Sequence, residues 1–159
     1  MKKFFIVLSI LLLVGCKSKK VVNEPAISVE TKIEKLGLSA VSESQKDKAY
    51  DLGKRVLMTC NTSKFKPFNE NEATSSVIQN TTEERLTKTC TKFRQLYGTF
   101  KDLQLIEIYK NNSDKIIIFR YKALYTKKVA NKELRVSINE ENKVSAIKSL
   151  DWVDTFQNK

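Results

Sequence analysis

The sequence of 159 residues contains no histidine, only four glycines and two prolines, and three cysteines. Without histidine, the chain cannot form a catalytic triad, a histidine general base or a histidine-ligated metal site. The cysteines are too few for a zinc site made of thiolates alone, and no segment has the regular Asp/Asn spacing of a calcium-binding loop. A site made only of Asp and Glu remains open, but we assign no metal, cofactor or catalytic residue.

Acidic residues are also scarce, with 18 Asp and Glu against 29 Lys and Arg and a formal net charge of +11. This balance favours anionic surfaces, although a solvated lysine-rich surface is the simpler interpretation. Lys127, Lys128, Lys132 and Arg135 form a basic cluster without interleaved exposed aromatic residues. We therefore expect the cluster to face membrane headgroups or solvent, and we predict no nucleic-acid partner.

Residues 1–15 have the parts of a secretory signal peptide. Lys2 and Lys3 precede an apolar run over residues 4–14 that is too short to span a bilayer, and Gly15 follows as a small residue before the cleavage point. We therefore expect export, with the signal removed from the mature protein.

The ending Leu13-Val14-Gly15-Cys16 resembles the bacterial lipoprotein signal. The resemblance implies cleavage before Cys16, a diacylglycerol on its sulfur and an acyl chain such as palmitate on its new amino group. Cys16 is thus the predicted lipidation site, and its lipid makes the membrane a partner in the bacterial cell envelope. Surface-exported lipoproteins of the resembled bacteria tend to carry acidic residues directly after the lipidated Cys. Residues 17–20 are Lys-Ser-Lys-Lys instead, which favours a periplasm-facing location.

After the signal, residues 16–43 are expected to be a tether. Ile27, Val29, Thr31 and Ile33 alternate with polar residues, so an edge strand over 27–33 packed on the domain is an equally good interpretation. Residues 44–159 form the predicted domain.

Two amphipathic helices begin this domain. The first starts at the capping box of Ser42 and Gln45, and its apolar spacing continues as far as Cys60. A short helix is expected over residues 72–78. A longer one starts at the capping box Thr81-Thr82-Glu83-Glu84 and ends at Gly98, a residue type common after helix ends.

The remainder predicts strands at residues 103–108, 116–125, 134–138 and 144–152, the first with a bulge because its alternation is broken. Short turns between the strands make neighbours antiparallel, so we expect a curved four-stranded meander covered by the helices. The fold class is α+β.

This order of elements, the helix end at residues 93–98 and the final hairpin around Asn142-Lys143 resemble the nuclear transport factor-like (cystatin-like) cone fold. The resemblance covers roughly residues 44–159, and the chain also resembles small envelope lipoproteins of unknown function. The family includes isomerases, dehydratases and non-catalytic binding modules, and its enzymes place an Asp, a Tyr or an Asp/His pair inside the cone. Arg120 and Glu107 would face inward only if a bulge shifted the register, and we expect them on a solvated face.

Cys60 and Cys90 lie on apolar helix faces in a chain predicted to be exported. A disulfide between them would close a loop of about 30 residues and stabilise the fold by roughly 3–4 kcal/mol. Two buried free thiols are the alternative.

Aromatic residues at strand spacing are candidates to line an apolar pocket in the mouth of the cone, with an ordinary filled core as the alternative. They are Tyr97, Tyr109, Phe119, Tyr121, Tyr125 and Trp152.

Together these observations predict a non-catalytic, lipid-anchored envelope protein that binds a small apolar ligand or a protein partner. An enzyme that uses Tyr and Asp/Glu acid–base chemistry inside the cone is the first alternative, and a structural envelope component is the second.

Overall fold

The computed structural model describes residues 33–127 and 132–158. Most of the region from the predicted signal to the edge strand expected at 27–33, including Cys16, lies outside the described residues. The described helices are η1 (Leu38–Ala40, 3-10), α1 (Glu43–Thr62), α2 (Ser75–Asn80) and α3 (Glu83–Tyr97). The strands are β1 (Ile33–Leu36), β2 (Phe100–Asn111), β3 (Ile116–Tyr125), β4 (Lys132–Asn139) and β5 (Val144–Asp151).

The capping boxes predicted from the sequence start both long helices, and the cap of α3 is the second threonine of Thr81-Thr82-Glu83-Glu84. The Ser42 side chain accepts a hydrogen bond from the backbone N–H of Gln45, and the Thr82 side chain accepts one from Arg85. Helix α3 is followed by Gly98, whose positive φ of 79° suits a glycine. The short helix begins later than predicted, after Thr74.

The sheet is antiparallel and has five strands in the order β1-β2-β3-β4-β5, one more than the predicted four-stranded meander. Strand β1 pairs with the outer edge of β2, from Ile33 opposite Asn111 to Leu36 opposite Ile108. Strand β2 runs to Asn111, beyond its predicted end, and this extra length offers an unpaired edge to β1. The α+β class is as predicted.

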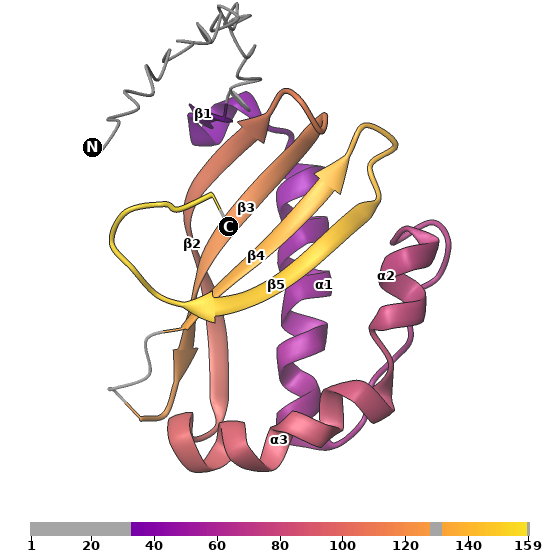
Figure 1. Cartoon of the computed structure of the whole chain (residues 1–159), viewed down its shortest axis with the longest axis vertical. Coiled ribbons are helices and arrows are strands. Elements are labelled where there is room, and N and C mark those ends of the chain that lie inside the picture. Colours follow the sequence, from indigo (N-terminus) through magenta and orange to yellow (C-terminus); the bar gives the residue numbers. More distant parts are fainter. Residues whose placement is uncertain (1–32, 128–131, 159) are drawn as a thin grey trace, which may run out of the picture. The chain divides into compact units, whose positions relative to one another are not determined.

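Helix α1 packs on one face of this sheet, as Figure 1 shows. Gly53 permits the close approach, because a Cβ at this position would lie 2.9 Å from Leu134 and 3.1 Å from Val136. The side chains between helix and sheet are fully buried, including Ile108, Phe119 and Tyr121. The space between α1 and this face of the sheet is therefore filled by side chains. Within the described ranges, no helix is long and apolar enough to cross a membrane.

Candidate functional site

A disulfide joins α1 to α3. The sulfur atoms of Cys60 and Cys90 are bonded at 2.09 Å and the Cα atoms are 4.8 Å apart, so the structure contains the pairing that the sequence suggested. Cys60 lies in the last turns of α1 and Cys90 in the middle of α3. The bond holds the two helices together where they cross near the end of the sheet (Figure 1).

Helix α3 has little other attachment to the core. Cys90 is its one buried residue, and Leu86, Phe93 and Tyr97 are only half-buried. At its N-terminal end, the Glu83 carboxylate accepts a hydrogen bond of 2.7 Å from the backbone N–H of Phe65. At its C-terminal end, the backbone N–H of Lys127 donates to the carbonyl of Tyr97 at 3.1 Å. Leu86 packs at the margin of the core, so the helix is attached by the disulfide, by backbone hydrogen bonds and by partly buried side chains rather than by a fully buried apolar face.

A cavity of about 390 Å³ lies between α1, α3 and the end of the sheet. Its walls come from α1, α3 and strands β2 to β5, and they include Cys60 of the disulfide. They are Val56, Leu57, Cys60, Asn61, Leu86, Thr89, Phe93, Arg94, Gly98, Phe100, Tyr125, Lys132 and Ser149.

Asn61 fixes the floor of the cavity to the sheet. Its side-chain N–H donates to the carbonyl of Phe100 at 2.7 Å, and its side-chain oxygen accepts from the N–H of Phe100 at 3.1 Å. Both polar atoms of this amide are therefore occupied by the backbone, and the surface left for a ligand is mostly apolar.

An aromatic cluster and one lysine form the side of the cavity next to β3 and β4. The ring of Tyr97 lies 5.2 Å from Phe93 and 5.7 Å from Tyr125, between centroids. Lys132 places its Nζ atom 5.2 Å from the Tyr97 ring centre and pairs with Asp151 at 2.7 Å. Burial opposes the charge of Lys132, but the hydrogen bond to Asp151 and the electrostatic interactions with Tyr97 and Asp151 together outweigh it and raise the lysine pKa.

Of the six aromatic residues predicted to line one pocket, only Tyr125 lines this cavity. Tyr97 lies behind it and borders a groove on the outer side of α3. Phe119 and Tyr121 are core residues under α1, where the helix leaves no space. Tyr109 and Trp152 lie on the opposite face of the sheet, so the predicted pocket is wrong in most of its residues. The sequence does indicate part of the cavity wall, because Leu86 and Phe93, which line the cavity, lie on one face of the predicted helix.

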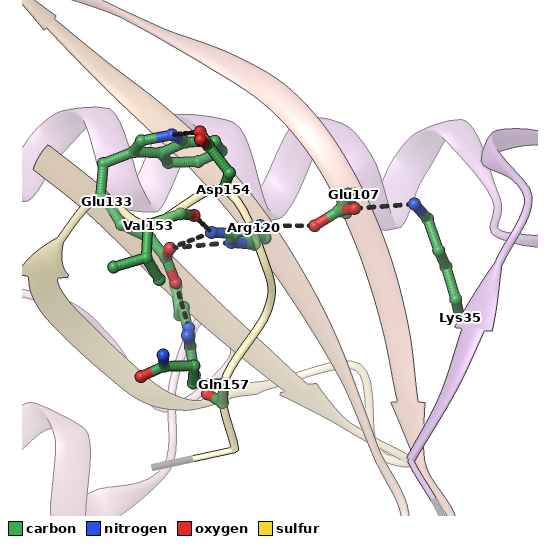
Figure 2. A network of polar contacts seen from close by, with 9 residues as sticks. Lys35, Glu107, Arg120, Glu133, Val153, Asp154 and Gln157 are labelled. Carbon is green, nitrogen blue, oxygen red and sulfur yellow. Dashed lines mark hydrogen bonds and ion pairs between the residues drawn. The ribbon is translucent and has the colours of Figure 1, made fainter. Parts of the chain in front are cut away.

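The opposite face of the sheet carries a buried ionic network (Figure 2). The Arg120 side chain, fully shielded from solvent, bonds the Glu107 carboxylate at 2.6 Å and the Glu133 carboxylate at 2.7 Å. Glu133 also bonds Arg135, and Lys35 bonds Glu107 at 2.7 Å. The network thus links strands β1 to β4.

The chain after β5 covers this network, as Figure 2 shows for Val153 and Gln157. The carbonyl of Val153 accepts a hydrogen bond from Arg120, and that of Gln157 accepts one from Arg135 at 2.6 Å. Trp152 lies over the Arg120 guanidinium at 4.1 Å, measured to the ring centre. The tail therefore replaces water above charged side chains that an open sheet face would leave solvated.

Two predictions about this face are wrong. Arg120 and Glu107 do not lie on a solvated face, and Arg135 of the expected basic cluster is buried rather than turned to headgroups or solvent. A bulge between Leu105 and Glu107 changes the register of β2, so that Glu107 stands opposite Arg120. The bulge was expected, but the tail that buries the pair has no periodic pattern.

The carboxylates of the network are fully engaged. Burial disfavours the charge of Glu107, but hydrogen bonds from Lys35, Arg120 and Tyr109 outweigh it and hold its pKa below the ordinary value of 4.5. Burial and the hydrogen bond to Glu107 raise the pKa of Tyr109 to about 12. In the described part of the chain, no group of three or more acidic or cysteine side chains is placed to hold a metal ion.

No protein-family model, curated protein or solved structure matches the chain. The arrangement of residues in the cavity and in the network is therefore what bears on function.

Removing one partner from the buried network should destabilise the fold far more than removing one partner from an exposed ion pair. We predict that Glu133→Gln lowers the free energy of unfolding by about 3–5 kcal/mol, because it leaves two buried arginines without their shared anion. The control is Glu140→Gln, whose carboxylate pairs with Lys115 at 3.7 Å and is mostly exposed, and whose expected cost is about 0.5 kcal/mol or less. Guanidinium unfolding of both variants measures the difference, and equal costs would contradict the role given to the network.

Proposed function

We propose that this protein is a non-catalytic, lipid-anchored protein of the bacterial cell envelope whose domain binds a small apolar ligand. The anchor is Cys16, at the end of the lipoprotein-like signal, and the domain faces the periplasm. The ligand occupies the cavity between α1, α3 and the sheet.

The cavity is the observation that carries the proposal. Its volume of about 390 Å³ falls within the range of roughly 300–1,000 Å³ common for small-molecule sites. Val56, Leu57, Leu86 and Phe93, all only half-buried, leave apolar surface at its walls. A ligand that covered these side chains would remove that surface from water, which is the favourable term in apolar binding.

The chemistry of the charged groups supports binding rather than catalysis. The described residues that line the cavity include no Asp or Glu, and burial raises the pKa of the tyrosine among them, Tyr125, to about 12. The Glu107–Tyr109 pair is the nearest approach to the acid–base alternative. That pair is covered, however, because Tyr109 stacks on Phe156 at 3.9 Å and Glu107 is held by two cations.

The cystatin-like cone belongs to the same proposal. Two register shifts in β2 and a further one between β4 and β5 support a curved sheet, since bulges bend strands and increase their twist. Helix α1 then lies where a cone would hold its long helix, and α3 crosses near one end of the sheet.

The anchor is tested by metabolic labelling with an alkyne analogue of palmitate. We expect the wild-type chain to incorporate the label and Cys16→Ser to incorporate none, because the lipid is attached at this residue. Cys90→Ser is the control for loss of a cysteine and should remain labelled. Undiminished labelling of Cys16→Ser would contradict the anchor.

The cavity is tested with a photoreactive ligand, a decanol that carries a diazirine at the end of its chain, added to membranes containing the full chain. We expect it to crosslink to peptides from α1 and α3 that line the cavity. Leu86→Trp narrows the cavity with a larger ring and should strongly reduce this labelling. Leu38→Trp changes an exposed leucine in η1, outside the cavity, and should leave the labelling unchanged.

Two results would contradict binding in this cavity. One is labelling of Leu86→Trp at the wild-type level. The other is labelling spread over the surface in proportion to exposure, with no preference for the peptides that line the cavity.

A further inference from the structure

Among the described residues that line the cavity, two side chains are cationic and none is anionic. Arg94 and Lys132 stand beside walls that are otherwise apolar or neutral. We propose, on the basis of the proposed function, that the ligand is an amphipathic anion: an aliphatic carboxylate whose head is bound by Arg94 and Lys132. Its chain lies against Val56, Leu57 and Leu86.

Arg94 is the free cation of the site. It lies in the last turn of α3 and is exposed, and in the described part of the chain its side chain has no hydrogen bond or ion pair. A guanidinium presents five N–H donors in a planar fork that matches the two oxygens of a carboxylate. The donors that the protein leaves unused are thus available to a ligand at the cavity.

Lys132, unlike Arg94, is shielded from solvent and already paired with an acidic side chain. Its side chain is 13% exposed, whereas its partner Asp151 is 83% exposed. The lysine is held beside the rings of Phe93 and Tyr97, with Nζ within 5.6 Å of both centres. Asp151 offsets one positive charge from the solvent side, so Arg94 leaves the site with a net positive charge for an entering anion.

The apolar walls strengthen this preference for a negative head. Charges interact more strongly next to a medium of low dielectric constant than in water. A neutral alcohol of the same chain length would gain the apolar contacts and a hydrogen bond from Arg94, but not the attraction between opposite charges. An alkylammonium ion would gain the same apolar contacts and meet repulsion.

The test compares two photoreactive probes of equal chain length, decanoate and decanol with terminal diazirines, on membranes containing the full chain. The concentration that gives half-maximal labelling of the cavity peptides is measured for the wild type and for Arg94→Gln. We expect Arg94→Gln to weaken decanoate by about tenfold, the loss of one charge-assisted contact, and to leave decanol within twofold. Comparing each probe with itself cancels its partition into the membrane.

Arg85→Gln is the matched control. Arg85 is an exposed arginine on the same helix, but its side chain donates to the Asn80 side chain and does not line the cavity. It should leave the labelling by both probes unchanged. Added salt should weaken decanoate binding to the wild type more than to Arg94→Gln.

The outcomes separate this inference from the function on which it rests. If both probes label the cavity and Arg94→Gln changes neither, the anionic head is wrong while apolar binding stands. If Arg85→Gln weakens decanoate as much as Arg94→Gln, the effect is general surface charge and the assigned head site is wrong. If neither probe labels the cavity in the wild type, both the inference and the proposed function fail.

Discussion

Helix α3 is held beside α1 by a covalent bond, where most helices of its length are held by an apolar face. Its 15 residues bury only Cys90, which is bonded to Cys60. An amphipathic helix normally closes the space below it, because its apolar residues pack into the core. Here the disulfide fixes the distance between the helices, and the half-buried side chains of α3 line a cavity instead of filling one.

The sheet provides the rigid side of that cavity. On the α1 face, Gly53 brings the helix close to Leu134 and Val136, and the space is filled. On the other face, Arg120 joins carboxylates from two neighbouring strands and a carbonyl of the C-terminal tail. Such pairs are costly to desolvate and costly to break, so they favour one arrangement of strands and tail over others.

Local patterns in the sequence predicted the helices, the capping boxes that start the two long ones, the antiparallel strands and the bulge in β2. The disulfide was one of two possibilities, because spacing along the chain does not fix the distance between two Cα atoms. The burial of Arg120 could not be predicted, since alternation indicates which side chains share a face but not what covers that face. The aromatic residues were assigned to a pocket by their strand spacing, and Phe119 and Tyr121 instead lie under α1, where packing is tight.

Hydrogen exchange with and without a reductant tests most directly whether the disulfide, rather than packing, holds α3 over the cavity. Reduction of the wild type should speed amide exchange in α3, while β3 and β4 keep their protection. A Cys60→Ala/Cys90→Ala variant should exchange quickly in α3 under both conditions. Unchanged protection of α3 after verified reduction, or loss of protection in α3 and the sheet together, would contradict the claim.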